Sequence, residues 1–314
     1  MSKPILTLTV NPAIDSIVTV DRLVFEDRAY IESTTEAAGG RGINAARVLT
    51  SFGANVMAIT TSGPREGGRR FEEALQQDGF AKEIVKIRQP IRNNLTISDR
   101  RGLSVKLNER GPKLSTAEQS LISKAVEKHL ANASWLMLCG SLPPAVEPHF
   151  YTKLIRLAAK HEVRTFLDTD GDALLHGLEA HPTLVKPNQS EAERLLNVPL
   201  ITRSQWIGAV QQIRDMGAKA VALSLGSRGI IASTSDGILE AVPPPIEAVC
   251  PIGAGDAAAA IVWSYDRGDS ISEALRWGVA AGTASSKLPG INLANLEQTE
   301  EIYARTTVTK IGAQ

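Results

Sequence analysis

A glycine-rich segment near the C-terminus carries a single carboxylate. "GAGD" (residues 253–256) is followed by Ala257–Ala260, a run of small residues typical of a closely packed helix. A helix start leaves about four N–H groups without intrahelical acceptors and carries a partial positive charge. The segment therefore predicts an anion-binding helix start in which Asp256 could accept a proton. The alternative is that Asp256 only caps the helix.

A second glycine-rich segment, "AAGGRGINAARVL", contains Gly39, Gly40 and Gly42 ahead of an expected helix. Its "GRGINA" formally satisfies the dinucleotide fingerprint G-x-G-x-x-A. That fingerprint also needs an acidic residue about 20 positions further on, where this sequence has Thr60 and Thr61. An NAD(P)-dependent oxidoreductase therefore stays only a distant alternative.

Other catalytic signatures are absent from the sequence. It has no P-loop G-x-x-x-x-G-K-[ST], no H-R-D or D-F-G, no G-x-S-x-G and no H-E-x-x-H. The five histidines are scattered over expected helices and loops, and we interpret four of them as structural: His149, His161, His176 and His181. The sequence thus argues against a P-loop NTPase and a zinc protease.

The composition is that of an ordinary globular protein with balanced charge. The 314 residues include 34 Lys and Arg against 34 Asp and Glu, with 43% hydrophobic residues. This balance predicts binding neither to nucleic acid nor to a membrane surface. Cys139 and Cys250 lie outside any C-x-x-C pair and indicate no zinc or disulfide framework. The first apolar stretch is too short for a leader or a membrane span, so we expect a cytoplasmic protein.

Apolar runs alternate with helical patterns from about residue 130 onward. This β-α-β order is typical of a parallel sheet with helices on both faces. Upstream, Ser115 and Glu118 have the spacing of a capping box at a helix start. The expected strands are 135–139, 163–168, 183–186 and 220–225, and the expected helices include 189–197, 203–216, 254–267 and 271–286.

Two segments break this alternation and predict a small β-sheet. "SIVTVDR" with "AYIEST", and "NLTISDRRGLSVKL", have the pattern of hairpin strands, and Ile97 would face Val105 across the second hairpin. A few strands with one apolar face are only marginally stable until that face is covered. We expect this small sheet, built from about residues 16–35 and 92–108, to cover a ligand, a partner subunit or both.

Six motifs resemble one family in their order and spacing. They are "NPAID" (11–15), "GGRGIN" (39–44), "GSLPP" (140–144), "VKPNQSE" (185–191), "SLGSRG" (224–229) and "GAGD" (253–256). Together they resemble the PfkB or ribokinase family of carbohydrate kinases over nearly the whole chain. They are most similar to its sugar-phosphate branch, the 1-phosphofructokinases, tagatose-6-phosphate kinases and minor bacterial 6-phosphofructokinases.

The resemblance implies a fold and a reaction. The fold is α/β: a ribokinase-like three-layer α/β/α sandwich with a mostly parallel central sheet and a small β-sheet lid, in a single kinase domain over residues 1–314. The reaction is ATP- and Mg²⁺-dependent phosphorylation of a ketohexose phosphate, namely fructose 6-phosphate, fructose 1-phosphate or tagatose 6-phosphate. The partner is a second copy of the chain, joined through the lid as a homodimer.

The resemblance also implies roles for the glycine-rich helix start. Asp256 would be the general base that takes the proton of the acceptor hydroxyl. The N–H groups of Gly253, Ala254, Gly255 and Asp256 would form the anion hole for the migrating phosphoryl group. A carboxylate beside a positive backbone pocket is what phosphoryl transfer requires.

Other residues would hold the phosphorylated acceptor. Arg92 and Arg28 would bind its phosphate, Arg28 being donated by the partner subunit, because bidentate guanidinium groups suit phosphate. Arg41 stands where close relatives have Gly or Lys, so it would either add a phosphate ligand or crowd a different sugar. The remaining acceptor ligands implied by the resemblance are Asp15, Gly39, Gly40, Asn44 and Ser141.

A third set would hold ATP and magnesium. Lys186 would reach the phosphates, and Asn188 with Glu191 would place Mg²⁺ through water, because this ion sheds its waters reluctantly. On the residues alone, Asn188 and Glu191 also fit a helix capping box, and the two roles can coexist. The nucleotide loop would contain Ser224, Gly226 and Gly229, and adenine would lie between residues 249–252 and the helix containing Ala280.

Two further alternatives keep the fold and change the function. One is a kinase of an unphosphorylated sugar or a nucleoside, which would not need Arg92. The other is a sugar-phosphate sensor without catalysis, which the joint presence of Asp256, Asn188 and Glu191 disfavours.

Overall fold

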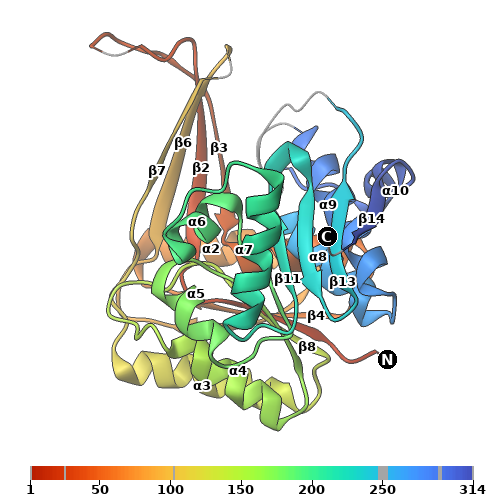
Figure 1. Ribbon diagram of the computed structural model, residues 1–314. Coiled ribbons are helices and arrows are strands. Elements are labelled where there is room, and N and C mark those ends of the chain that lie inside the picture. The colour runs from red at the N-terminus through yellow and green to blue at the C-terminus, as the bar shows by residue number, and fades with distance from the viewer. Residues whose placement is uncertain (1, 25, 102, 247–253, 289–291, 313–314) are drawn as a thin grey trace.

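The computed structural model describes residues 2–24, 26–101, 103–246, 254–288 and 292–312, without the side chains of residues 254 and 255. Its strands form two sheets, one of ten strands and one of four (Figure 1). Among the described residues, no helix combines the length and apolar character needed to cross a membrane.

The large sheet is mostly parallel. Its order is β14-β13-β12-β11-β10-β9-β8-β1-β4-β5, and the three strands β12, β13 and β14 pair antiparallel at one edge. The central strands β1 and β8 are buried at every position, as parallel strands covered on both faces require. The bounds are β1 (Ile5–Thr9), β4 (Val56–Ser62), β5 (Ala81–Lys86), β8 (Trp135–Cys139), β9 (Arg164–Asp168), β10 (Leu184–Val185), β11 (Val221–Ser224), β12 (Ile230–Thr234), β13 (Gly237–Val242) and β14 (Thr307–Ile311).

Helices cover both faces of this sheet and give the three layers (Figure 1). One layer contains α1 (Arg41–Ser51), α8 (Ala254–Asp266), α9 (Ile271–Ser286) and α10 (Leu296–Tyr303), which pack against one another in that order. The other contains α3 (Thr116–Leu130), α4 (Phe150–Lys160), α5 (Gly171–Leu178) and α6 (Gln189–Leu196), again in sequence, with α7 (Arg203–Asp215) over β11 and β12. A further helix, α2 (Arg65–Gln76), contacts the small sheet.

Local sequence explains where several of these helices begin. Ser115 and Glu118 form the predicted capping box of α3, with the Glu118 side chain accepting from the Ser115 N–H. Thr202 and Gln205 do the same for α7. The predicted strands at 135–139 and 220–225 are confirmed as β8 and β11, whereas α10 and the edge strand β14 had no prediction.

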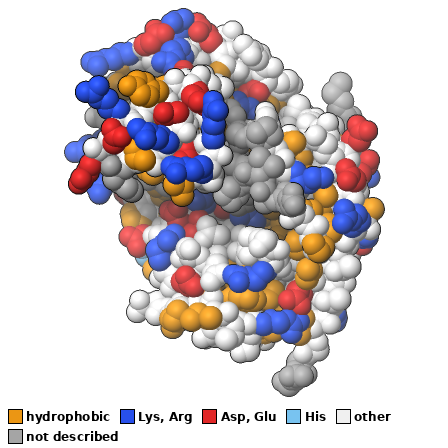
Figure 2. Space-filling model, turned by 90° about the horizontal axis from the view of Figure 1, so that it is seen from above, with side chains coloured by type: hydrophobic (Ala, Val, Ile, Leu, Met, Phe, Trp, Pro, Cys, Tyr) orange, Lys and Arg blue, Asp and Glu red, His pale blue; other side chains and the backbone are white. Residues whose placement is uncertain are grey.

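The small sheet has the order β3-β2-β6-β7, with β2 (Ala13–Val20), β3 (Ile31–Gly39), β6 (Arg92–Asp99) and β7 (Ser104–Asn108). The predicted hairpins β2–β3 and β6–β7 are confirmed, and Ile97 pairs with Val105. Because successive side chains alternate between faces, Val18, Ile97 and Val105 share one face, and Asp15 and Asn94 share the other. Figure 2 shows charged and apolar side chains gathered over this sheet.

The packing of α8 against α9 positions the predicted catalytic segment. Ala257–Ala260 are all buried, so small side chains let α8 approach its neighbours closely. Opposite them, α9 has Gly278, where an added Cβ would lie 2.4 Å from Ile261 Cγ1 and 3.1 Å from the Ala257 carbonyl oxygen. The two helices therefore leave no room for a side chain at this position.

Two Gly→Ala variants test this contact. A Cβ at Gly278 meets buried Ile261, whereas one at Gly208, inside α7, meets nothing within 4 Å. Gly208→Ala should raise the free energy of unfolding in urea by roughly 0.5–1 kcal/mol, the usual helical gain of alanine. Gly278→Ala should lower it by about 1–3 kcal/mol through overpacking. Equal shifts in the two variants would contradict the packing described here.

Candidate active site

Asp256 lies in the first turn of α8 and is 3% exposed. Burial raises the pKa of its carboxyl group to about 7, although a hydrogen bond with Ser285 on α9 works in the opposite direction. Its Oδ2 has no hydrogen-bond partner among the described residues. A carboxylate with a free oxygen and a pKa near neutrality has the properties of a general base.

A second carboxylate, the half-buried Asp15, lies on β2 near the start of the small sheet. Its Oδ1 accepts a 2.8 Å hydrogen bond from Asn94 Nδ2 on β6. Burial raises the pKa of Asp15, opposed by this hydrogen bond and by the charge of Arg92. A Cβ at Gly39 would lie 1.9 Å from Asp15 Oδ2, so only glycine fits beside this carboxylate. The geometry brings Asp15 and Gly39 together, as predicted for an acceptor site.

Arg92 starts β6 on the same face as Asn94. Its NH1 donates 3.2 Å to the Glu109 carbonyl oxygen, and its Nε is buried without a partner among the described residues. Burial lowers the pKa of the guanidinium, while the charge of Asp15 raises it. A partly buried guanidinium with an unused N–H is suited to an incoming anion.

The glycine-rich segment joins β3 to α1. Gly40 is the N-cap of α1 with φ 138°, a backbone conformation that favours glycine. Asn44 follows in the first turn, where its Oδ1 accepts from Arg47 NH1 at 3.3 Å. On the other side, Ser141 accepts a 3.3 Å hydrogen bond from Asn11 Nδ2. Ser141 therefore follows the C-terminal end of β8 in the large sheet, where ligands of parallel sheets bind, whereas Gly40 follows β3 of the small sheet.

Arg28 is not brought to this site within its own chain. It is exposed in the turn between β2 and β3, beyond their outermost pair Val20–Ile31. Asp15 lies five residues before Val20 along β2, about 17 Å at the usual rise of a strand. Any contact of Arg28 with an acceptor would have to be made in another copy of the chain.

A cavity of about 550 Å³ lies at the C-terminal ends of β9, β10 and β11. Of the nucleotide and metal residues predicted from the sequence, Asn188, Glu191, Ser224 and Gly226 line it. Asn188 also pairs with Ser224 in an isolated parallel bridge, which ties the start of α6 to the end of β11. The full lining is Arg41, Asp170, Asn188, Gln189, Ser190, Glu191, Arg194, Ser224, Leu225 and Gly226.

Two predicted nucleotide residues do not line this cavity. Lys186 is 2% exposed, and its Nζ lies 3.7 Å from Asp168 Oδ1. Gly229 has φ 88°, and a Cβ there would lie 2.0 Å from the Ala241 carbonyl oxygen on β13. The close approach of the neighbouring strand thus explains Gly229 without a ligand.

Asn188 and Glu191 form the capping box of α6. Asn188 Oδ1 accepts from the Glu191 N–H at 2.8 Å, and Glu191 Oε2 accepts from the Asn188 N–H at 2.8 Å. The remaining oxygen of Glu191, Oε1, accepts from Arg41 NH2 at 2.9 Å. Both oxygens of Glu191 are thus engaged within the protein.

Arg41 reaches from the first turn of α1 into the wall of this cavity. Besides Glu191, it pairs with Asp168 at 3.1 Å and with Asp170 at 3.4 Å. Burial opposes its charge, but these carboxylates raise the pKa of Arg41 well above its usual value. Its side chain therefore joins the glycine-rich segment of the acceptor side to the lining of the nucleotide cavity.

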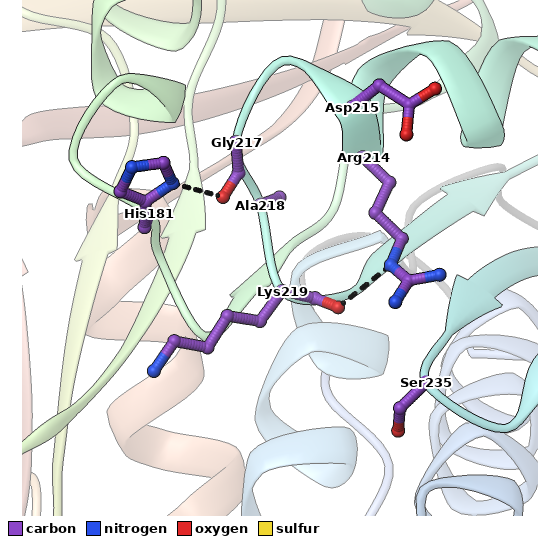
Figure 3. Close-up of a pocket in the computed structure, with 7 residues that line it drawn as sticks. All are labelled: His181, Arg214, Asp215, Gly217, Ala218, Lys219 and Ser235. Carbon is purple, nitrogen blue, oxygen red and sulfur yellow. Dashed lines mark hydrogen bonds between the residues drawn. The ribbon is translucent and has the colours of Figure 1, made fainter.

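A larger depression, of about 700 Å³, lies at the opposite end of β11, where this strand begins. Figure 3 shows Arg214 donating to the Lys219 carbonyl oxygen and the His181 ring against the Gly217 carbonyl oxygen. These residues precede β11, whereas Ser224 ends it. None of the residues predicted to do chemistry lines this depression, so it is not the candidate active site.

Some predictions fall outside the described residues, namely Gly253 in the anion hole and the adenine contact at 249–252. Ala254 and Gly255 are the first two residues of α8. Several polar residues that touch the site had no predicted role: Asn11, Asn94, Asp168 and Ser285. Asn11 stands inside "NPAID" and Asp168 ends the predicted strand "VRTFLD", so their positions were the available signal.

Comparison with known proteins finds carbohydrate kinases of one family. The family model described as pfkB family carbohydrate kinase matches residues 8–298. The chain is 31% identical over 304 residues to the ATP-dependent 6-phosphofructokinase isozyme 2 of Escherichia coli, covering 96% of this chain and 98% of the relative. It is 30% identical to the 1-phosphofructokinase of Borreliella burgdorferi, covering 98% and 99%.

A solved structure agrees with these relatives. The crystal structure of phosphofructokinase-2 from Escherichia coli in complex with potassium superimposes with a TM-score of 0.90 at 30% identity, covering 96% of this chain and 99% of that one. The predicted fold class, a ribokinase-like α/β/α sandwich with a small lid sheet, is confirmed.

The raised pKa of Asp256 predicts a pH-dependent stability. The Asp256 carboxyl group titrates at 3.8 in the unfolded chain and at about 7 in the folded one. The folded protein therefore loses stability as pH rises between these values, because the unfolded chain carries the negative charge in water. Asp256→Asn removes the charge and keeps the shape. The variant should be more stable than the wild type by roughly 2–4 kcal/mol at pH 8 and nearly equal to it at pH 4. Urea unfolding at several pH values measures this, and a pH-independent difference would contradict it.

Proposed function

The chain belongs to the pfkB family of carbohydrate kinases, and we propose that it transfers the γ-phosphoryl group of ATP to a hydroxyl of a ketohexose phosphate. The candidate acceptors are fructose 6-phosphate, fructose 1-phosphate and tagatose 6-phosphate, and residues 1–314 act as one kinase domain. The single observation that carries the proposal is Asp256, a buried carboxylate with a free oxygen at a helix start.

Proton transfer is the step assigned to Asp256. Its pKa of about 7 makes it a stronger base than an exposed carboxylate while leaving it charged at slightly alkaline pH. The free Oδ2 would take the proton of the acceptor hydroxyl as that oxygen attacks phosphorus. The first N–H groups of α8 lack intrahelical acceptors, so they would donate to the phosphoryl oxygens, on which negative charge accumulates.

The acceptor would lie between the small sheet and α1. Asp15 is held by Asn94 and lies against Gly39 of the glycine-rich segment, where it would accept hydrogen bonds from sugar hydroxyls. Arg92, with its unused Nε, would bind the phosphate that the acceptor already carries. A neutral sugar would leave the Nε–H of this partly buried guanidinium without an acceptor, and this favours a phosphorylated acceptor over the unphosphorylated alternative.

The nucleotide would occupy the cavity lined by Asn188, Glu191 and Ser224, with Gly226 close to the phosphates. The donor set there, carboxylates and an amide oxygen, fits Mg²⁺, which prefers oxygen ligands. Because both oxygens of Glu191 are already hydrogen-bonded, they would hold the ion through its water molecules. A bound Mg²⁺ neutralises phosphate charge; Lys186 would add a further positive charge behind Asp168.

We propose a homodimer formed through the small sheet. The face opposite Asp15 carries Val105 and Leu107, which are 39% and 53% exposed. An apolar sheet face with this exposure is stabilised when it is covered. A partner would also bring its Arg28, at the tip of the same sheet, toward the other subunit's acceptor.

A coupled ADP-release screen tests the function. We expect turnover of at least one of the three ketohexose phosphates with ATP and Mg²⁺. Asp256→Asn should lower kcat by about 10²–10⁴ through loss of the base, with little change in KM. Turnover by Asp256→Asn at the wild-type rate would rule out the assigned base. Activity on no sugar phosphate but on a free sugar or nucleoside would select the alternative acceptor class.

Arg92→Gln separates phosphorylated from neutral acceptors in the same assay. Losing a charged phosphate contact should lower kcat/KM for the phosphorylated acceptor by about 10²-fold, since a charge-assisted hydrogen bond contributes about 1.5–3 kcal/mol. The exposed Arg88→Gln is the matched control and should leave kcat/KM unchanged. Equal losses for phosphorylated and neutral sugars would remove Arg92 from the phosphate site.

The proposed dimer predicts the effect of a charge on the apolar face. Leu107→Asp should shift the sedimentation coefficient from dimer toward monomer, because a carboxylate would be buried without a partner in the interface. Leu121→Asp on α3 is the control, since Leu121 is 51% exposed, close to the 53% of Leu107. A wild-type chain that sediments as a monomer at micromolar concentration would contradict the interface.

A further inference from the structure

Two histidines and a glutamate converge at the contact between α4 and α5, away from the candidate active site. His149 is the N-cap of α4, and His176 lies in the last turn of α5 with Glu179 at its C-cap. One potential ligand atom from each residue lies within 4.8 Å of the other two. From the sequence, both histidines were interpreted as structural because the histidines are scattered over expected helices and loops.

The two helices are tied together beside this cluster. Thr152 is buried, and its Oγ1 donates 2.8 Å to the His176 carbonyl oxygen. The Lys153 N–H donates 3.0 Å to the His149 carbonyl oxygen, which fixes the first turn of α4. The backbones that carry the histidines are therefore held in place, while His149 and Glu179 remain exposed to solvent.

The side chains are already close to one another. The two imidazole rings stack with centroids 3.9 Å apart and planes 25° from parallel. His176 Nδ1 lies 2.9 Å from Glu179 Oε1. A carboxylate oxygen is thereby present beside the two stacked rings.

This donor set selects a class of ion. Zn²⁺ and similar first-row transition ions take imidazole nitrogens and a carboxylate oxygen, whereas Mg²⁺ and Ca²⁺ prefer oxygen ligands alone. Ligands of a tetrahedral zinc ion lie about 3.3 Å apart for bonds of about 2.0 Å. The atoms here must close from at most 4.8 Å, a movement available to exposed side chains by rotation.

We propose that His149, His176 and Glu179 form a binding site for Zn²⁺ or a related transition-metal ion that clamps α4 to α5. Two neutral imidazoles and one carboxylate occupy three positions of a tetrahedron, and water completes the fourth. The other end of α5 carries Asp170, its N-cap, in the lining of the nucleotide cavity. The clamp would thus fix the helix that presents Asp170, and it does not depend on the proposed function.

Calorimetric titration of the full chain with ZnCl₂ in a chelator-free buffer tests the site. We expect saturable binding of Zn²⁺, and we expect the bound ion to raise the midpoint of thermal unfolding. His149→Gln, His176→Gln and Glu179→Gln should each weaken this binding at least about tenfold, because losing even an outer-shell partner of a metal ligand costs roughly 10–100-fold. The matched control is His161→Gln, because His161 is also exposed and caps the other end of α4; it should bind like the wild type.

Spectroscopy with Co²⁺ identifies the ligands directly. Co²⁺ in place of zinc should give the visible absorption of a four-coordinate site in the wild type and in His161→Gln, and lose it in His149→Gln and His176→Gln. Unfolding of each variant in urea without metal checks that it is folded. No saturable binding below millimolar zinc, or equal binding by the wild type and both histidine variants, would overturn the proposal.

Discussion

The desolvation of Asp256 is the constraint on which the active-site region depends. A carboxylate that is 3% exposed is destabilised in its charged form, and Ser285 supplies a single compensating hydrogen bond. The chain holds it there because α8 and α9 pack closely through alanines and through Gly278. The same packing that raises the pKa of the carboxyl group also excludes water from it. Burying Asp256 thus lowers the stability of the folded protein, and the same burial gives the carboxylate the raised pKa of a base.

The small sheet has one polar face, at the acceptor site, and one apolar face. On one face, Asp15 and Asn94 form a hydrogen-bonded pair next to Gly39, with Arg92 two residues before Asn94. On the other, apolar side chains such as Val105 remain exposed. The alternation of a strand produces both faces from the same residues. A one-residue slip in register would bury the apolar set against the acceptor and expose Asp15.

Periodicity and turn chemistry predicted most of the fold, because they act over a few residues. The capping box of α3, the hairpin pairing Ile97 with Val105 and the buried strand β8 follow from such local patterns. The site was predicted less completely, because its contacts join distant segments. Asn94 meets Asp15 across 79 positions, and no local pattern pairs them. The resemblance supplied residue types for the site but not their contacts. It assigned Lys186 to the ATP phosphates and Gly229 to the nucleotide loop, and neither residue lines the cavity.

Arg41 shows how the two halves of the site are connected. It is the first residue of α1, directly after the glycines beside Asp15, and its guanidinium contacts Asp168 and Glu191 across the sheet. Among Arg41, Lys186, Asp168, Asp170 and Glu191, two positive charges face three negative ones, so the cluster keeps one negative charge in excess. Removing Arg41 would leave the nearly buried carboxylate of Glu191 without a cation, which is strongly destabilising. Electrostatic balance therefore requires the acceptor-side loop and the nucleotide-side helix to stay in contact, and their relative position is set by charge as well as by packing.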